Sequence, residues 1–138
     1  MVQPLPFRLP DSPAKTDLVA KYFRALGDPT RLRILELLQA EPGGELPAGE
    51  LGRRLGAPQP KVSNHLACLR WCGFVTTRRV HRVVYYRVAD ERVAAMLDLA
   101  HGLLRDNAEH VAACCRIQAP GPAPLGLELP RAVEVTSP

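Results

Sequence analysis

Apolar residues recur at the spacing of an α-helix in five segments of this chain. Residues at i, i+3, i+4 and i+7 fall on one face of a helix, so each segment predicts an amphipathic helix. The predicted helices span about residues 15–26, 29–40, 48–55, 59–73 and 90–115. The second has so broad an apolar face that we expect it to be central and largely buried.

Turn and capping residues separate these helices. Gly27 ends the first one, Asp28 is the predicted N-cap of the second, and Pro29 takes its first helical position, where a missing N–H costs nothing. Residues 56–58, Gly-Ala-Pro, form a tight turn between the third and fourth helices. A short helix, a tight turn and a longer helix with a polar front are typical of the helix-turn-helix motif.

After Gly73 the hydrophobic period changes from 3.6 residues to two. Residues 74–78 and 83–88 are rich in β-branched and aromatic side chains, which favour strands, and residues 79–82 are short enough to join them as a hairpin. A basic hairpin that follows a helix-turn-helix is a wing. We therefore expect a mainly α protein with a small β-hairpin, that is, a winged helix-turn-helix.

The last predicted helix carries an apolar seam over about 25 residues, or close to 37 Å at the standard helical rise. A small domain cannot easily cover such a stripe, so we expect a homodimer formed through the first and last helices. Most of the 14 prolines lie near the two chain ends. We expect residues 1–14 to form a flexible arm, residues 15–118 the folded domain, and residues 119–138 a disordered Pro-rich tail.

Basic charge is concentrated in residues 59–88, which hold six of the 18 Lys and Arg residues and none of the 14 Asp and Glu residues. Such a block on a nearly neutral body indicates nucleic-acid binding, with an ordinary solvated surface as the alternative. We expect double-stranded DNA as the partner. The candidate contact residues are Gln59, Lys61, Ser63, Asn64 and His65 on the fourth helix, and Arg78, Arg79, His81 and Arg82 on the wing.

The four cysteines are expected to be free thiols or metal ligands. No apolar run is long enough to span a membrane and no secretory signal is visible, so the cytoplasm is the default compartment, where structural disulfides are rare. Cys68 and Cys72 lie one turn apart on the fourth helix and can hold one soft metal ion between them. The alternative is that they pack as small apolar residues, although Val62, Leu66 and Leu69 already supply an apolar face.

With these elements placed, residues 17–117 resemble the ArsR/SmtB family of winged-helix repressors. The resemblance lies in residues 25–35 (Ala-Leu-Gly-Asp-Pro-Thr-Arg-Leu-Arg-Ile-Leu), 51–56, 62–66 (Val-Ser-Asn-His-Leu) and 82–88 (Arg-Val-Val-Tyr-Tyr-Arg-Val). The chain departs from the family at His81, because the wing tip is usually Gly. The resemblance implies a dimeric repressor that binds a palindromic operator and leaves it when an inducer binds.

Two of the family's inducer sites are not matched. One uses a Cys-x-Cys pair on the first helix of the reading motif, and residues 46–50 hold no cysteine. A zinc site across the last helices of a dimer uses Asp and His followed by His and Glu. Asp98, His101, Glu109 and His110 have the wrong spacings for that site.

Residues 65–73 are similar to a subgroup of cadmium and lead sensors, in which two cysteines of the recognition helix bind metal with a third from the partner's C-terminal region. This likeness implies Cys68 and Cys72 as ligands of Cd(II) or Pb(II), completed by Cys114 or Cys115. It leaves As(III) as an alternative inducer and implies no organic cofactor. We expect His65, in line with both cysteines, to face DNA or to pack rather than to ligate.

Two other functions stay open. The thiols could sense oxidants or persulfides instead of a metal, or the chain could bind DNA without any inducer. We do not expect an enzyme, because the sequence shows no nucleophile–base–orienter set and no phosphate-binding loop.

Overall fold

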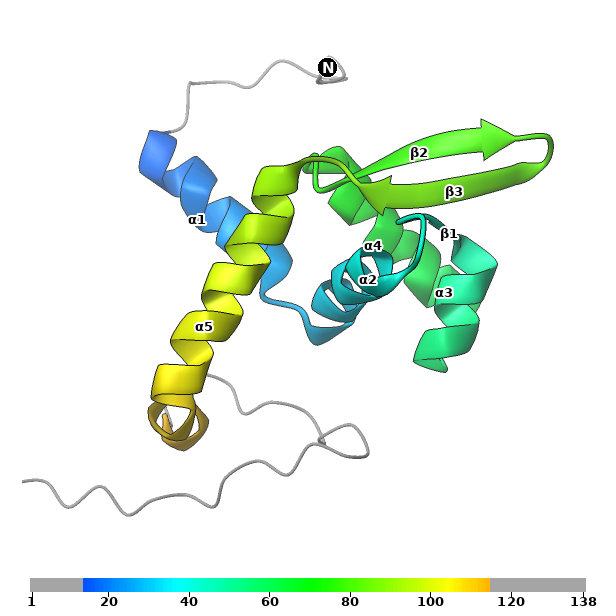
Figure 1. Ribbon diagram of the computed structural model, residues 1–138. Helices are drawn as coiled ribbons and strands as arrows, with labels where there is room; N and C mark the ends of the chain where they lie inside the picture. Colours follow the sequence, from blue (N-terminus) through cyan, green and yellow to red (C-terminus); the bar gives the residue numbers. More distant parts are fainter. Residues whose placement is uncertain (1–13, 115–138) are drawn as a thin grey trace, which may run out of the picture. The chain divides into compact units, whose positions relative to one another are not determined.

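The computed structural model describes residues 14–114 of the chain (Figure 1). They belong to two compact units, which divide between Ala94 and Ala95 and are described separately. Most of the predicted arm, residues 115–118 of the predicted domain and the whole predicted tail lie outside the described residues.

The first two helices begin and end where their local sequence predicts. Helix α1 spans Lys15–Leu26 and helix α2 spans Pro29–Ala40. The Asp28 side chain accepts hydrogen bonds from the backbone N–H groups of Thr30, at 2.9 Å, and Arg31, at 3.1 Å. These bonds satisfy donors that have no partner within the helix, which confirms Asp28 as the N-cap of α2.

The core of the first unit is built around α2 and the two helices that follow it. Helix α3 spans Ala48–Leu55 and helix α4 spans Gln59–Trp71. The largest fully buried side chains are Ile34, Leu35 and Leu38 of α2, Leu51 of α3, Val62, Leu66 and Leu69 of α4, and Val75 just after them. Each such side chain contributes about 1.5–3 kcal/mol on burial. Because three of them belong to α2, the predicted central position of this helix is confirmed.

Helices α3 and α4 form the predicted helix-turn-helix. Gly56 ends α3 with a left-handed φ of +62°, and Gly73 follows α4 with a φ of +82°. A side chain at either position would be strained, and glycine adopts the turn freely. A Cβ atom on Gly52 would lie 3.3 Å from the Ala57 carbonyl oxygen, so α3 and the turn approach each other closely at this point.

The wing belongs to a sheet of three strands, not two. Strand β1 spans Leu46–Pro47, β2 spans Val75–Val80 and β3 spans Val83–Val88, in the order β1-β3-β2 with both pairs antiparallel (Figure 1). The prediction missed β1 because a two-residue strand has no period of its own. It exists because the free edge of β3 pairs with it, Leu46 opposite Tyr86.

The predicted wing connection was too long. Strand β2 continues to Val80, which pairs with Val83, so only His81 and Arg82 form the turn. His81 has a φ of +55°, a conformation that Gly adopts without strain and that His adopts more readily than most residues. The departure from glycine at this position therefore leaves a tight hairpin in place.

Helix α5 spans Glu91–Ala113, so it begins one residue later and ends two residues earlier than predicted. The Asp90 carboxylate accepts a 2.8 Å hydrogen bond from the Arg92 N–H, as expected of a residue that caps a helix start. In the second unit this helix exposes Leu99, Leu103, Leu104 and Val111. Within the described part of the chain, no helix is long and apolar enough to cross a membrane.

Helix α1 also exposes apolar side chains. Leu18, Val19, Tyr22 and Phe23 are each more than two-fifths exposed, while Leu26 is buried. Tyr22 packs edge-on against Phe74, with ring centroids 5.3 Å apart. Only part of the predicted stripe of α1 therefore packs into the first unit.

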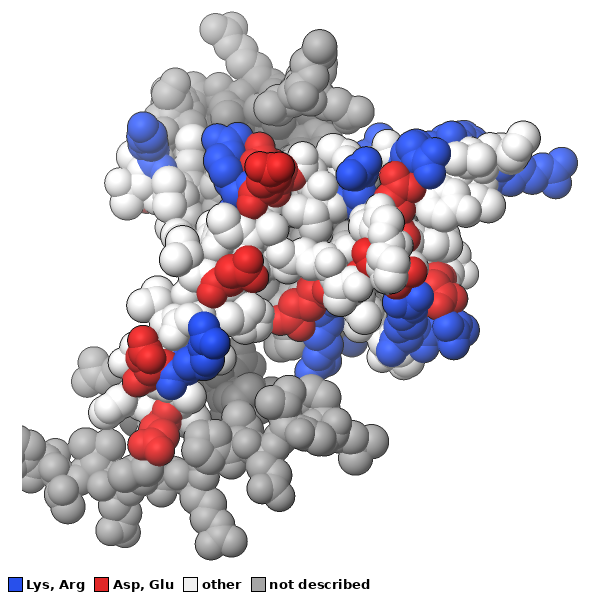
Figure 2. All heavy atoms as spheres, in the orientation of Figure 1, with Lys and Arg blue, Asp and Glu red and all other residues white. Residues whose placement is uncertain are grey.

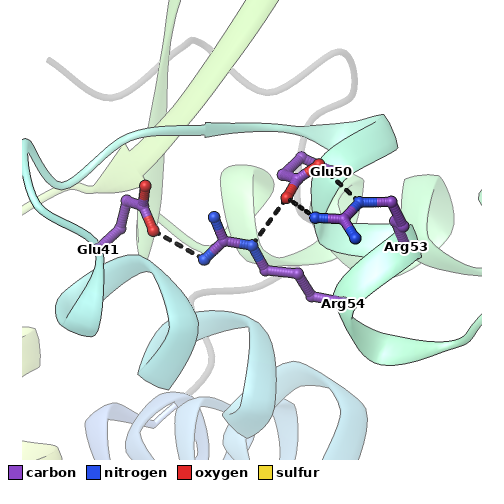
Figure 3. A network of polar contacts seen from close by, with 4 residues as sticks. All are labelled: Glu41, Glu50, Arg53 and Arg54. Atoms are coloured by element: carbon purple, nitrogen blue, oxygen red, sulfur yellow. Dashed lines mark hydrogen bonds and ion pairs between the residues drawn. The ribbon is translucent and has the colours of Figure 1, made fainter.

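A network of ion pairs joins the end of α2 to α3 (Figure 3). Arg54 donates to Glu41 at 2.7 Å and to Glu50 at 2.9 Å, and Arg53 also pairs with Glu50. The hydrogen bonds from Arg53 and Arg54 lower the pKa of Glu50 to about 2. Arg54 thus bridges a loop and a helix that are separated along the chain.

Because the pKa of Glu50 is lower in the folded protein than its usual 4.5, its stabilising effect is complete above about pH 4.5 and disappears as the pH falls towards 2. In chemical denaturation across this range, Glu50→Gln should show a smaller loss of unfolding free energy than the wild type. Glu109→Gln, at an exposed position of α5, is the matched control and should follow the wild type. Equal acid sensitivity of Glu50→Gln and wild type would contradict the prediction.

Candidate nucleic-acid interface and thiol site

Helix α4 has a buried face and a polar front. Burial of Val62, Leu66 and Leu69 fixes its rotation, and the predicted DNA-reading residues Gln59, Lys61, Ser63 and Asn64 are all exposed. Lys can contact phosphates, and Asn and Gln can bond adenine edges in a major groove. The front half of α4 therefore exposes side chains that can bind phosphates and base edges.

His65 is placed differently from the other four. It is half-buried and lies near Asp28, at the start of α2. Burial by itself would raise the pKa of Asp28. The hydrogen bond from the Arg31 N–H and the charges of His65 and Arg31 outweigh it, so the pKa of this carboxyl lies below its usual value. His65 thus sits between the polar front of α4 and the start of α2.

The wing carries its basic residues near its outer end. Arg82 lies in the turn and Arg79 lies shortly before it. Both are exposed, as is His81, and Figure 2 shows Lys and Arg side chains along the hairpin, including its outer end. Arg79 donates to the His81 carbonyl oxygen at 3.2 Å. Neither Arg79 nor Arg82 forms an ion pair with any described residue, so both are available to phosphates.

The base of the wing is less basic than the sequence count suggests. Arg78 donates to the Glu45 carboxylate at 2.7 Å, and Arg87 lies 3.6 Å from the same group. The hydrogen bond from Arg78 lowers the pKa of the Glu45 carboxyl. The basic segment of residues 59–88 holds no Asp or Glu of its own, but the fold brings Glu45 to it from the loop before β1.

The back of α4 holds the two predicted thiols. Cys68 and Cys72 are free and half-buried, at the end of the helix that follows the polar front. The Arg31 Nη1 donates to the Cys68 sulfur at 3.3 Å, whereas the Arg31 Nε is buried with no hydrogen-bond partner among the described residues. A cation from the first turn of α2 therefore reaches the thiol site.

The two sulfurs also act on each other. Burial raises the pKa of the Cys72 thiol, and the nearby Cys68 raises it further, while the charges of Arg31 and Lys21 oppose the rise. Cys68 and Cys72 thus form one pair of soft donors beside two cations. This donor set suits a thiophilic ion, which displaces the thiol protons as it binds.

The predicted third ligand does not belong to the unit that holds this pair. Cys114 follows α5 in the second unit and is free and half-buried, and Cys115 lies outside the described residues. Within residues 14–114, no three His, Cys, Asp or Glu side chains gather as a metal-binding group. Cys114 and Cys115 therefore remain predicted ligands.

Sequence reasoning missed Arg31 and Asp28 as parts of this site. Both lie in the segment that carried the family resemblance, where they could be assigned only to the start of α2. Arg31 is 37 residues from Cys68 along the chain, so no local spacing could have paired them.

Comparisons with known proteins identify a family and several relatives of this chain. Residues 28–77 match the family model described as bacterial regulatory protein, arsR family. A probable mercury resistance operon repressor from Streptomyces lividans is 43% identical over 105 residues, which cover 76% of this chain and 82% of that protein. The regulator CmtR from Mycobacterium tuberculosis is 44% identical over 79 residues, but the match spans only 64% of its length.

Solved structures agree. A homodimeric winged helix-turn-helix DNA-binding domain from Mycobacterium bovis, titled a possible ArsR-family transcriptional regulator, has a TM-score of 0.62 and 30% identity. The match covers 75% of this chain and 95% of the Mycobacterium bovis chain. Reduced HlyU from Vibrio cholerae has a TM-score of 0.56 and 36% identity. The match covers 64% of this chain and 90% of the HlyU chain.

These relatives are regulators, which confirms the predictions of a winged helix-turn-helix fold and of a protein that is not an enzyme. The chain belongs to the ArsR family of bacterial regulatory proteins, whose members are winged helix-turn-helix DNA-binding transcriptional regulators.

Proposed function

We propose that this chain is a homodimeric repressor that leaves its operator when Cys68 and Cys72 bind a thiophilic metal ion. The observation that carries the proposal is the position of two half-buried thiols on the same helix that exposes the DNA-reading residues. The similarity to a mercury resistance operon repressor and to CmtR supports a soft-metal signal.

DNA recognition would use the front of α4 and the outer end of the wing. Gln59, Lys61, Ser63 and Asn64 would contact base edges and phosphates, His65 would contribute from the edge of this surface, and Arg78, Arg79, His81 and Arg82 would contact the backbone. The exposed apolar residues of α1 and α5 support pairing with a second copy. A palindromic operator would then match the two-fold symmetry.

Cd(II) and Pb(II) are the first-choice inducers, because both prefer thiolate ligands and both accept three sulfurs. Cys114 or Cys115 would supply the third sulfur to Cys68 and Cys72. As(III), which also takes three thiolates, is the alternative inducer. Binding would join the end of α4 to the C-terminal region. A coupling of ~3 kcal/mol between this site and DNA is enough for a roughly 150-fold loss of operator affinity.

A second function, sensing of oxidants or persulfides, is favoured by one observation. The hydrogen bond from Arg31 to the Cys68 sulfur would stabilise negative charge on an oxidised or persulfidated form of this atom. Against it, the raised pKa of Cys72 lowers the fraction of reactive thiolate at the second sulfur. A metal ion meets no such barrier, because it displaces the proton as it binds.

Cys68→Ser should keep wild-type affinity for operator DNA and lose release by Cd(II) and Pb(II), because the substitution removes one sulfur without touching the exposed front of α4. The measurement is fluorescence anisotropy on a duplex that the protein selects from randomised DNA, with and without metal. Release of Cys68→Ser at wild-type metal concentrations would refute the site. Release of the wild type by peroxide alone would favour the second function.

Lys61→Ala and Asn64→Ala should weaken DNA binding in different ways. Loss of a phosphate contact at Lys61 should lower affinity for every sequence and reduce the slope of log affinity against log salt by about one. Loss of a base contact at Asn64 should instead cost about 1–3 kcal/mol on the selected duplex and little on unrelated DNA. Identical behaviour of the two variants would contradict these roles.

Glu45→Gln should strengthen DNA binding, because it frees the charges of Arg78 and Arg87 for phosphates. We expect roughly a threefold gain in affinity near 0.1 M salt and a salt dependence steeper by about one counterion. Glu109→Gln, which removes an acidic charge from α5, is the control and should leave both quantities unchanged. Weaker binding by Glu45→Gln would show that the ion pair holds Arg78 in its DNA-contacting position.

A further inference from the structure

Arg31 is a partly buried cation whose partner is a sulfur atom. Its guanidinium donates to Cys68 at 3.3 Å and forms no ion pair with a carboxylate of the described residues. Its Nε–H is buried and has no hydrogen-bond partner there. Asp28, the nearby acid, accepts from the Arg31 backbone N–H rather than from its side chain. A partly buried guanidinium that has no hydrogen-bonded carboxylate is stabilised by a nearby negative charge, so Arg31 favours an anion at the thiol site.

The candidate inducers differ in the charge that they leave at this site. Three thiols that bind Cd(II) or Pb(II) release three protons, and the resulting complex carries a net charge of minus one. Three thiols that bind As(III), supplied as arsenous acid, release three waters and give a neutral complex. Two thiols that bind Hg(II) release two protons and also give a neutral complex. Only the three-sulfur complex of a divalent ion is anionic.

We propose that Arg31 is the counter-cation of the sensor site and that it selects three-thiolate complexes of divalent soft ions over the neutral complexes of As(III) or Hg(II). This inference rests on the proposed function, because it assumes that Cys68 and Cys72 bind the inducer together with a third sulfur, from Cys114 or Cys115. Arg31 is a positioning and selectivity residue and does not itself ligate.

The other charges around the site do not replace Arg31. Lys21 also acts on Cys72, but it is exposed and its charge is screened by water. Asp28 is acidic and interacts with His65, so these two residues together supply no net positive charge that could replace Arg31. Among the residues that the structure describes, Arg31 alone combines a direct contact to sulfur with an unused, buried N–H. The planar guanidinium carries five donors, so it can bond more than one sulfur.

The test compares metal affinities of full-length variants. Arg31→Gln removes the charge and keeps hydrogen-bond donors, Arg31→Lys keeps the charge, and Arg33→Gln, at an exposed position two residues along α2, is the matched control. Cd(II), Pb(II) and As(III) are titrated anaerobically and followed by sulfur-to-metal absorption. Fluorescence of Trp71, the chain's single tryptophan, which is 56% exposed and adjoins Cys72, provides a second signal.

We expect Arg31→Gln to weaken Cd(II) and Pb(II) binding about tenfold or more and As(III) binding by less than about twofold, as for loss of one hydrogen bond to a charged group. Arg31→Lys should recover most of the divalent affinity, and Arg33→Gln should match the wild type. Equal losses for all three ions, or no loss, would overturn the inference.

Two further variants keep the outcomes separable. Arg31→Met removes both the charge and the buried unpartnered N–H, so it supplies a neutral variant if Arg31→Gln does not fold, as judged by circular dichroism. Cys68→Ser tests the proposed function itself. If Cys68→Ser loses metal binding while the ratio of Cd(II) to As(III) affinity is unchanged by the neutral Arg31 variants, only the selectivity inference fails. If Cys68→Ser binds all three ions normally, both proposals fail.

Discussion

The burial of one face of α4 is the constraint on which the rest of the site depends. Val62, Leu66 and Leu69 are fully buried against the core, so the helix cannot rotate about its axis without exposing them. Exposing three such side chains would cost several kcal/mol, about 1.5–3 for each. Everything else on α4, the polar front as well as the two thiols, takes its direction from this packing.

Because of that constraint, the two ends of α4 have different surroundings. Its first two turns carry exposed polar residues, and its last turn carries half-buried thiols beside α2. Because a helix is stiff, a pull on the last turn moves the first turns as well. A signal at the thiols therefore needs no long path to reach the DNA-reading surface in the proposed mechanism, since both ends belong to one rigid element.

The basic residues fall into two groups, those that already have a partner within the fold and those that are free to bind phosphate. Glu45 holds Arg78 and Arg87 at the base of the wing, and Arg31 is held by the Cys68 sulfur, whereas Arg79 and Arg82 near the turn have no acidic partner among the described residues. The cations that are free to meet phosphate thus lie at the outer end of the hairpin. The basic residues that have partners within the fold instead link segments that are distant along the chain.

The helices, their caps and the polar front of α4 were determined by the sequence itself, because these features depend on residues within one or two turns. Asp28 caps α2 as predicted, α4 begins at Gln59 as predicted, and the period of two predicted both long strands. The two thiols were found by their spacing, and the family by its motifs. These parts required no knowledge of long-range contacts.

Only the tertiary structure decided which distant groups meet. Strand β1 exists because β3 offers it an edge, and Glu45 meets Arg78 across 33 residues of chain. Arg31 meets Cys68 across 37 residues, and His65 interacts with Asp28 at the start of α2. A periodic pattern records which face of a helix is buried but not what it is buried against. The reading helix and its two thiols could therefore be found in the sequence, whereas the cation that lies beside one of those thiols could not.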